Sequence, residues 1–403
     1  MSAVEQKAMN QKVSLVEEVA GLFKGNIREY AMYIVLVAII AIFSFITDGL
    51  FISSRNISNL INQTGYIAVL AVGMTLILII KQIDLSVGFV AGFLGAIAAI
   101  LMTKSGISEW ITIPIILVFG LVIGLFYGFL VAKVGVPAFV ATLAGQLVFR
   151  GLLLLVTEGS GTIIIPNKGF NAIGNDFIPD IFKGSSIHLL TLIIGALAIV
   201  FFIYSQIKAR KNMKKYNFKV VSDPIFITKL VFIAVIISGI VWILASYNGL
   251  SWTVVIVAVV VFIYNFVMNK TTYGRYVYGI GGNAEAAELS GVNVVKITSM
   301  VFASMGLLAA LSGILFTSRL QSATTVAGNG FELDAIAAAY IGGVSANGGI
   351  GKVTGSIIGA LVMSSLSSGM NLMGVGISYQ YVIRGTILVL AVVFDVMTRK
   401  ANK

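Results

Sequence analysis

Long apolar runs dominate the chain, and each is close to the 20 or so residues that a helix needs to cross a bilayer. Lipid cannot satisfy backbone polar groups, so a run that crosses the hydrocarbon core must be helical. The composition agrees, since 58% of residues are hydrophobic and 11% are charged, whereas soluble domains carry about 25% charged residues. The sequence therefore predicts an all-α, polytopic membrane helical bundle of about twelve transmembrane helices, with ten as the lower limit. The runs are 30–47, 65–80, 87–103, 111–132, 138–156, 188–206, 225–247, 250–268, 297–317, 333–344, 353–370 and 379–397.

Basic residues between the runs predict the sidedness of the chain. Segment 208–219 holds six Lys/Arg and no acid, which is typical of a cytoplasmic loop. Six runs precede this basic loop and six follow it, so both termini are expected in the cytoplasm. We predict a cytoplasmic amino-terminal segment at 1–29 and a single transmembrane domain at 30–403. Within that domain, 158–187 would form a periplasmic loop and 269–296 a second cytoplasmic loop.

Two segments do not fit a simple series of spans. The stretch Ser53–Asn62 is too polar to cross a membrane, so we expect a short interfacial helix on the outer side. The run 333–344 is short and is followed by the glycine-rich string SANGGIGK, which favours a broken or re-entrant helix. Non-helical backbone at membrane depth needs protein or a water-filled cavity around it. Close helix packing is the alternative use of these glycines, and whether 333–352 crosses fully stays open.

Several function classes are excluded by the residue content. The formal charge of +11 is distributed as the positive-inside rule requires, so we expect no nucleic-acid partner. Cysteine is absent and His188 is the single histidine, which leaves no disulfide, thiolate metal site or histidine cluster. We accordingly predict no metal site and no catalytic residues.

Nucleotide sites are also missing. The string GGIGKV at Gly348–Val353 resembles a P-loop, but Ala346 stands where a glycine is required and Val353 where Ser or Thr would bind magnesium. The string at 279–284 fits G-x-G-x-x-A but follows no strand. We therefore expect no cofactor in this chain, and any ATP and magnesium would belong to a partner.

The energy source for transport would then be a partner or an ion gradient. Ion-coupled transporters commonly place ionisable residues at mid-membrane, whereas the charged residues here fall at or near the ends of the runs. This pattern favours a neutral, polar substrate moved with the help of a partner. An ion-coupled secondary transporter and a purely structural membrane protein both remain as alternatives.

Loop 269–296 contains the pattern of a short exposed helix. Asn283 can cap a helix over Ala284–Ser290, and Gly291 can end it. Glu285 lies in the first turn, where a negative charge favours the helix dipole. A helix this short is marginal alone in water. We expect it to dock on another protein that covers Ala286, Ala287 and Leu289, although a solvated loop is the alternative.

The same loop carries a family resemblance. Glu285-Ala286-Ala287, followed by Gly291, is similar to the first part of the EAA loop of bacterial ABC importer permeases, although the Ile and Leu-Pro that end that signature are absent. The wider string at 274–293 resembles the monosaccharide permeases for ribose, galactose and xylose. Other motifs of that family follow the same order here. They are IDLSVG at 83–88, PAFVATLAG at 137–145 with Arg150-Gly151 after it, and ELDAIAA at 332–338 with Gly342-Gly343 and GGIG at 348–351.

The resemblance is strongest to the xylose and multiple-monosaccharide subgroup, which has three spans where short members have one. It implies a multi-pass permease of the bacterial inner membrane that imports xylose or a related pentose or hexose. It also implies four kinds of partner: a second copy of the permease, a cytoplasmic tandem ATP-binding protein that hydrolyses ATP, a periplasmic or lipid-anchored sugar-binding protein, and membrane lipid. Which monosaccharide is carried is not identified.

Two sets of site residues follow from the motifs. The resemblance assigns coupling to the ATPase to Gly274, Arg275, Asn283, Glu285, Ala286, Ala287 and Gly291. Pathway or gating candidates are Asp84, Ser86, Glu332, Asp334, Asn347 and Asn371. Each member of the second set could instead cap a helix or satisfy the backbone. For the sugar-binding protein we expect a docking region within Gly159–Lys183.

Overall fold

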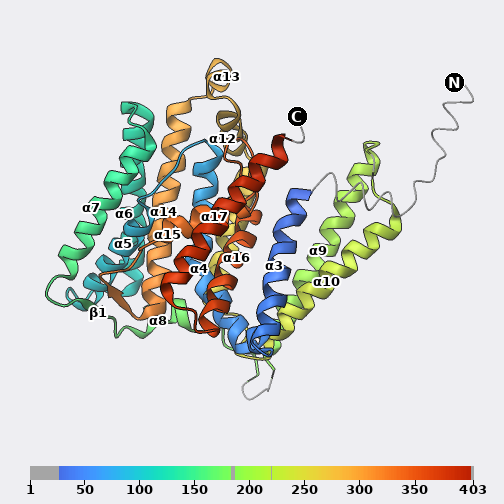
Figure 1. Cartoon of the computed structure of the whole chain (residues 1–403), viewed down its shortest axis with the longest axis horizontal. Helices are drawn as coiled ribbons and strands as arrows, with labels where there is room; N and C mark the ends of the chain where they lie inside the picture. The colour runs from blue at the N-terminus through green and yellow to red at the C-terminus, as the bar shows by residue number, and fades with distance from the viewer. Residues whose placement is uncertain (1–26, 183–186, 219, 401–403) are drawn as a thin grey trace, which may run out of the picture. The chain divides into compact units, whose positions relative to one another are not determined.

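The computed structural model of the chain describes residues 27–182, 187–218 and 220–400 (Figure 1). Nearly all of its regular structure is helical. The α-helices are α3 (Ile27–Ile46), α4 (Ser54–Ile79), α5 (Val87–Thr103), α6 (Glu109–Gly128), α7 (Ala138–Thr157), α8 (Lys168–Asn175), α9 (Leu189–Lys215), α10 (Asp223–Ala245), α11 (Trp252–Lys270), α12 (Thr272–Gly282), α13 (Ala284–Leu289), α14 (Val294–Leu320), α15 (Phe331–Ile341), α16 (Val353–Leu372) and α17 (Ile377–Lys400). A short helix η1 (Leu50–Ile52), a π-helical turn η2 (Phe129–Val134) and two short strands, β1 (Thr162–Ile164) and β2 (Ser322–Thr324), complete the elements. The expected segment 1–29 lies almost wholly outside the described residues.

Every apolar run predicted from the sequence forms a helix. Within the described residues, nine helices are long and apolar enough to cross a membrane, which confirms a polytopic helical membrane protein. The runs at α5 and α15 form shorter helices of 17 and 11 residues. With 11 residues, α15 is only about 16 Å long, too short to cross about 30 Å of hydrocarbon by itself. The helix before the glycine-rich string is therefore short, and a broken or re-entrant segment at 333–352 stays a prediction.

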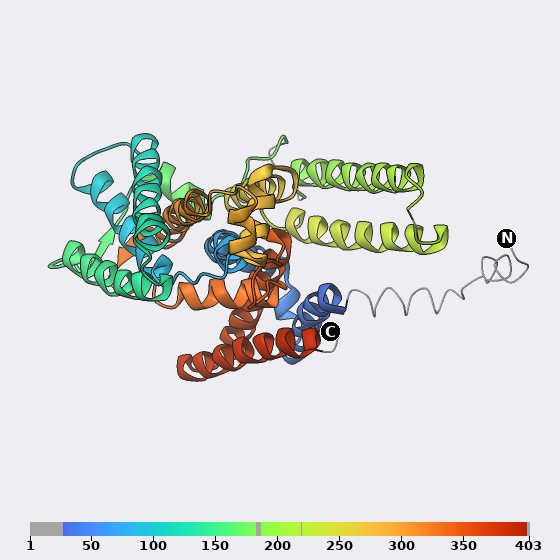
Figure 2. The same cartoon turned by 90° about the horizontal axis from the view of Figure 1, so that it is seen from above.

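The chain divides into two compact units. The smaller includes 180–249, whose helices α9 and α10 form an antiparallel hairpin (Figure 2). Asp180 lies at the start of this segment, and its carboxylate accepts hydrogen bonds from the backbone N–H groups of Leu189 and Leu190 in the first turn of α9, both at 2.9 Å. Burial raises the pKa of Asp180, but the backbone hydrogen bonds and nearby His188 outweigh it and hold that pKa below its ordinary value.

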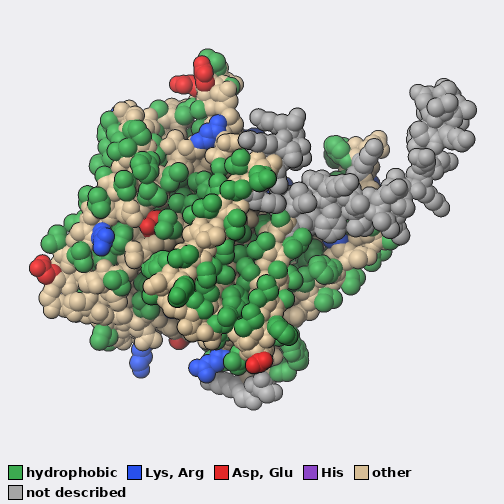
Figure 3. All heavy atoms as spheres, in the orientation of Figure 1, with side chains coloured by type: hydrophobic (Ala, Val, Ile, Leu, Met, Phe, Trp, Pro, Cys, Tyr) green, Lys and Arg blue, Asp and Glu red, His purple; other side chains and the backbone are tan. Residues whose placement is uncertain are grey.

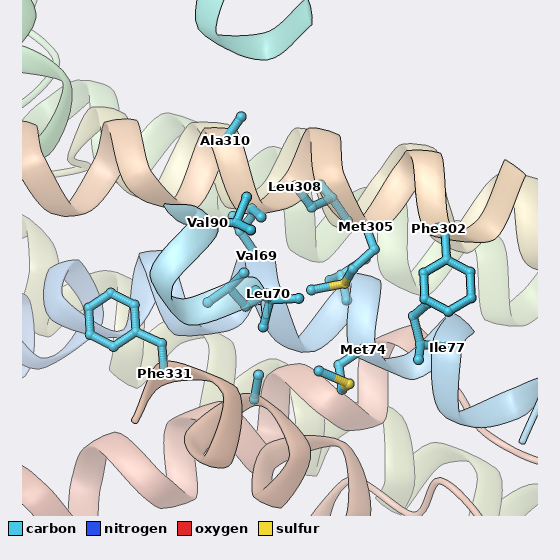
Figure 4. Packing of buried hydrophobic residues seen from close by; sticks show 14 of the residues in the cluster. Val69, Leu70, Met74, Ile77, Val90, Phe302, Met305, Leu308, Ala310 and Phe331 are labelled. Carbon is cyan, nitrogen blue, oxygen red and sulfur yellow. The ribbon is translucent and has the colours of Figure 1, made fainter. Parts of the chain in front are cut away.

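The larger unit comprises 32–179 and 250–403, and α14 lies at its centre. Helix α4 runs antiparallel to α14, since Tyr66 accepts a hydrogen bond from the Ser312 hydroxyl at 3.0 Å whereas Gly73, further along α4, lies against the earlier residue Met305 of α14. Figure 4 shows Met74 and Leu70 of α4 close to Met305 and Leu308 of α14. These side chains are at most 2% exposed. Burial of such side chains within one unit fixes the central helices against each other.

Helix α6 crosses α14 at small residues. A Cβ atom on Gly306 would lie 2.1 Å from the carbonyl oxygen of Gly120, and one on Gly120 would lie 2.3 Å from that of Gly306. Neither position has room for a methyl group, so the two backbones touch. Small residues at helix crossings are the usual means of close approach in membrane proteins.

Two expectations about short polar segments were wrong. Ser53–Asn62 does not form a separate interfacial helix, because it belongs to α4, which continues without a break to Ile79. Its polar side chains are partly satisfied inside the unit, where the hydroxyl of Ser251 donates to Asn62. Segment 208–219 is not mainly a loop either. Residues 208–215 form the last two turns of α9, because Lys and Arg are good helix formers.

The stretch expected as a long outer loop, 158–187, contains two regular elements, β1 and α8. β1 pairs antiparallel with β2, and α8 packs against the end of α14. There the hydroxyl of Ser318 donates to the carbonyl of Phe170 and accepts from the N–H of Gly174, both at 2.7 Å. Phe170 is fully buried. The segment is thus attached to the helical core rather than extended from it, and Lys183 lies outside the described residues.

Candidate functional site

Helix α13 projects from one end of the larger unit (Figure 1). The side chain of Asn283 accepts a hydrogen bond from the N–H of Ala286 at 3.0 Å, and Gly291 follows with φ +85°. The predicted cap and end of this helix are therefore confirmed. Glu285 lies in the first turn and Leu289 is 85% exposed. Figure 3 shows acidic side chains on this projection.

The other residues of the coupling set divide into exposed and buried groups. Arg275, Glu285, Ala286 and Gly291 are exposed, as a docking surface requires. Ala287 is only 9% exposed because it packs into the core of its own unit, so the expectation that a partner covers it was wrong. Gly274 is buried, and a Cβ there would lie 2.1 Å from the carbonyl oxygen of Met268. Gly274 permits α12 to pack on α11.

Three segments meet tightly beneath α13. The N–H of Gly349 donates to the carbonyl of Ile79 at 2.9 Å, and a Cβ on Gly281 would lie 1.9 Å from that same oxygen. The ammonium of Lys81 donates to the carbonyl of Gly282 at 3.1 Å. We call this meeting of α12, the end of α4 and the loop at 345–351 the junction.

Tyr278 closes the junction with a side-chain hydrogen bond. Its hydroxyl donates to the carbonyl of Gly351 at 2.7 Å. Burial raises the pKa of Tyr278, so the hydroxyl keeps the proton that it donates. The family-like motifs at 274–293 and 348–351 are therefore in direct contact.

The other three motifs meet around the first turn of α5. On α7, Thr142 and Gln146 lie four residues apart and so on one face. The hydroxyl of Thr142 lies 3.3 Å from the carbonyl oxygen of Ile83, and the amide of Gln146 donates to Glu332 at 2.9 Å. A Cβ on Gly88 would lie 2.4 Å from Glu332 Oε2. We call this meeting the inner cluster.

Asp84 and Ser86 form a hydrogen-bonded turn within the inner cluster, just before α5. One oxygen of the buried Asp84 carboxylate accepts from the N–H of Ser86 at 2.9 Å and from its hydroxyl at 2.7 Å. Both residues line a gap together with Tyr127 and residues of α5, α6 and α14. The gap has room for a volume of about 10 Å³, which is about what one water molecule needs. A monosaccharide does not fit there in this conformation.

Glu332 and Asp334 lie in the first turn of α15 and have different partners. Glu332 is 4% exposed, and its Oε2 has no hydrogen-bond partner among the described residues. Asp334 pairs with Arg384 of α17 at 3.5 Å. Both acids thus connect α15 to another helix, through Gln146 in the first case and Arg384 in the second.

Asn347 and Asn371 lie far from each other. Both are exposed, at opposite ends of the 20-residue α16, which is about 30 Å long. The N–H of Asn347 donates to the hydroxyl of Ser345, and Asn371 accepts from Gln380. These hydrogen bonds go to neighbouring residues of the chain rather than to Asp84 or Glu332.

Gln146 and Tyr278 were missed by the sequence reasoning. Tyr278 lies inside the family-like string, so its position was known, but nothing in that string indicates a bond to Gly351. Gln146 follows directly after the motif at 137–145. Its spacing of four from Thr142 is the one signal that could have found it.

Comparison with known proteins identifies the family of this chain. The family described as branched-chain amino acid transport system / permease component matches residues 56–392. The chain belongs to this permease family. No solved structure matches the chain.

Relatives extend the match over nearly the whole length. The xylose transport system permease protein XylH of Escherichia coli K12 is 38% identical, covering 98% of this chain and 100% of the relative. XylH of Haemophilus influenzae is 40% identical, covering 93% and 98%. The ribose import permease protein RbsC of Escherichia coli K12 is 33% identical, covering 92% and 95%.

Proposed function

We propose that this chain is the transmembrane permease subunit of an ATP-binding cassette importer that carries a monosaccharide across the bacterial inner membrane. Xylose or a related pentose or hexose is the proposed substrate, because the relatives named above are xylose and ribose permeases. The observation that carries the proposal is α13. It is a capped, exposed helix that stands on a tightly packed base and carries the EAA-like residues on its surface.

A separate ATPase would supply the energy by binding α13. Glu285, Ala286 and Leu289 are exposed on that helix, and Arg275 is exposed on the neighbouring α12. ATP and magnesium would be held by the partner, and the permease itself would perform no catalysis. Asn283 and Gly291 fix the two ends of the docking helix.

A movement of α13 would be transmitted to the inner cluster through the junction and a short stretch of chain. The junction connects α12 to Ile79 and Lys81, and the same stretch of chain reaches Asp84, Ser86 and Gly88 within a few residues. A shift of α12 would therefore displace the first turn of α5. The residue Ile83 just before that turn accepts a hydrogen bond from Thr142 of α7, and Gly88 within the turn lies against Glu332 of α15. Gln146 in turn joins α7 to α15 by its hydrogen bond to Glu332.

The complete importer would contain further partners. Two permease copies would surround the sugar pathway, each with about twelve spans and both termini in the cytoplasm. A periplasmic or lipid-anchored protein would deliver the sugar to the face that carries β1 and α8. Asp84, Ser86, Glu332 and Asp334 would act by changing how α5, α7, α15 and α17 contact one another.

Charge reversal at Glu285 tests the coupling helix. Glu285→Lys should leave expression and membrane insertion intact, because the side chain is exposed. Unfavourable charge contacts at an interface cost several kcal/mol, so ATP-dependent sugar uptake should fall more than about tenfold. The readout is uptake of labelled sugar by cells or proteoliposomes that contain the whole importer.

Asp48→Lys is the matched control, because Asp48 is also an exposed acid but lies between α3 and η1, outside both α13 and the proposed docking region at 159–183. This variant should transport at the normal rate. Normal uptake by Glu285→Lys, or an equal loss in both variants, would remove the coupling assignment.

A further inference from the structure

One face of the polar end of α9 holds the hairpin together. Arg210 and Lys214 lie four residues apart and both approach the carboxylate of Asp223 at the start of α10, at 2.6 Å and 3.8 Å. Arg210 also donates to the carbonyl of Val221 at 2.8 Å and stacks 4.3 Å from the ring centre of Phe226. These contacts join the two helices and neutralise the charge of Asp223.

A different face of the same turns carries unneutralised charge. Tyr204, Lys208, Lys211 and Lys215 are spaced by four, three and four residues, which aligns them in one stripe along a helix. All four side chains are exposed. None of the three lysines forms an ion pair within the part of the chain that the structure describes. We call these four residues the basic stripe.

The stripe continues toward the middle of α9 with apolar side chains. Leu197 and Phe201 are 64% and 70% exposed and precede Tyr204 on the same side of the helix. The order is thus apolar, aromatic and basic, which matches hydrocarbon, interface and headgroup layers of a membrane. Residues 189–207 span about 28 Å, close to the thickness of the hydrocarbon core of about 30 Å. The lysines therefore lie at headgroup level.

We propose that the basic stripe binds an anionic phospholipid. The lipid phosphate contacts Lys208, Lys211 and Lys215, and an acyl chain lies along Leu197 and Phe201. Lysine is a common phosphate ligand, and basic clusters beside a membrane span attract anionic lipids. Sidedness requires positive charge at this end but does not require three lysines aligned on one exposed face.

Lipid binding to the purified full-length chain tests the proposal. Native mass spectrometry would count retained phosphatidylglycerol and phosphatidylcholine across a range of lipid concentrations. We expect the wild-type chain to retain phosphatidylglycerol at lower concentrations. The double variant Lys211→Gln/Lys215→Gln should weaken that binding more than about fivefold and leave phosphatidylcholine binding unchanged.

The control removes the same charge elsewhere. Lys133→Gln/Lys270→Gln changes two other exposed lysines and should bind phosphatidylglycerol as the wild-type chain does. Equal loss in both double variants would mean that net charge attracts the lipid, and would overturn the proposal. Equal retention of the two lipids by the wild-type chain would also overturn it.

Salt provides a second test if the stripe variant does not fold. Raising the salt concentration should weaken phosphatidylglycerol binding by the wild-type chain but not phosphatidylcholine binding. Binding of phosphatidylglycerol that does not change with salt contradicts a site made of lysines.

Discussion

At the scale of single residues, the buried acid Glu332 is a site candidate whose carboxylate is only half satisfied by hydrogen bonds within the described residues. One carboxylate oxygen accepts from Gln146, whereas Oε2 has no partner among the described residues. A buried polar atom without a hydrogen bond costs about 1–3 kcal/mol. The hydrogen bond from Gln146 is therefore the contact that offsets this cost, and it holds α15 to α7.

Two substitutions at Glu332 separate the hydrogen bond from the charge. Glu332→Gln keeps an oxygen for Gln146 and removes the unpaired charge, so the variant should unfold at the wild-type temperature or higher. Glu332→Ala leaves Gln146 without its partner and should lower stability by about 1–3 kcal/mol. The measurement is thermal unfolding of the purified chain in detergent. Equal destabilisation by both substitutions would show that the carboxylate itself is required.

Residue-level prediction from the sequence succeeded where the signal was local. Asn283 and Gly291 cap and end α13 through backbone rules that operate over a few residues. Asn347 and Asn371 were paired only because both lie near irregular helices. The length of α16 between them separates them, and sequence spacing alone did not indicate that.

At the scale of elements, small residues set how closely α6 and α14 approach. Gly306→Ala would place a methyl group 2.1 Å from the carbonyl of Gly120, so the helices would have to separate. Overpacking of this kind costs about 1–3 kcal/mol. We expect a lower thermal unfolding temperature in detergent for this variant.

Gly239→Ala in α10 is the matched control. A Cβ at Gly239 has nothing within 4 Å, and alanine favours a helix by about 1 kcal/mol over glycine. This variant should be as stable as the wild-type chain or more stable. A stability loss equal to that of Gly306→Ala would contradict the close crossing.

The α9–α10 hairpin is connected as a separate module. The N–H of Ile178 donates to the carbonyl of Leu250 at 2.8 Å, so the chain enters and leaves 180–249 at one place. Excision of 180–249, with Pro179 joined to Leu250 by a short Gly-Ser linker, should leave a folded, monodisperse membrane protein by size-exclusion chromatography.

Excision of 331–372 is the control for this deletion. It also removes two helices, but α15 and α16 pack within the larger unit, where Ala338 and Ala360 share a buried cluster with α4. The control should aggregate. Aggregation of the 180–249 deletion would contradict the independence of the hairpin.

Helices were predictable from the sequence because each run is long and apolar. Boundaries were less predictable where polar residues continue a helix. The turns of α4 before Gly65 and the basic turns of α9 look like loops by composition. Buried hydrogen bonds in the first case and helix propensity in the second keep them helical.

At the scale of the whole molecule, the family-like motifs form two connected groups. The sequence placed them in order along the chain but could not indicate which would touch. The junction joins 274–293 to 348–351 through Tyr278. The inner cluster joins the other three motifs through Thr142 and Gln146. The stretch from Ile79 to Gly88 belongs to both groups, and it would give an ATPase that binds α13, as proposed, a physical connection to the interior.

The most direct test of this importer assignment is sugar uptake by proteoliposomes that contain this chain, with xylose, arabinose, galactose and glucose as substrates. The account predicts uptake of at least one of these sugars only when the ATPase, the sugar-binding protein and ATP are all present. Sugar accumulation by this chain alone, driven by a proton or sodium gradient, would contradict the account and establish an ion-coupled transporter instead.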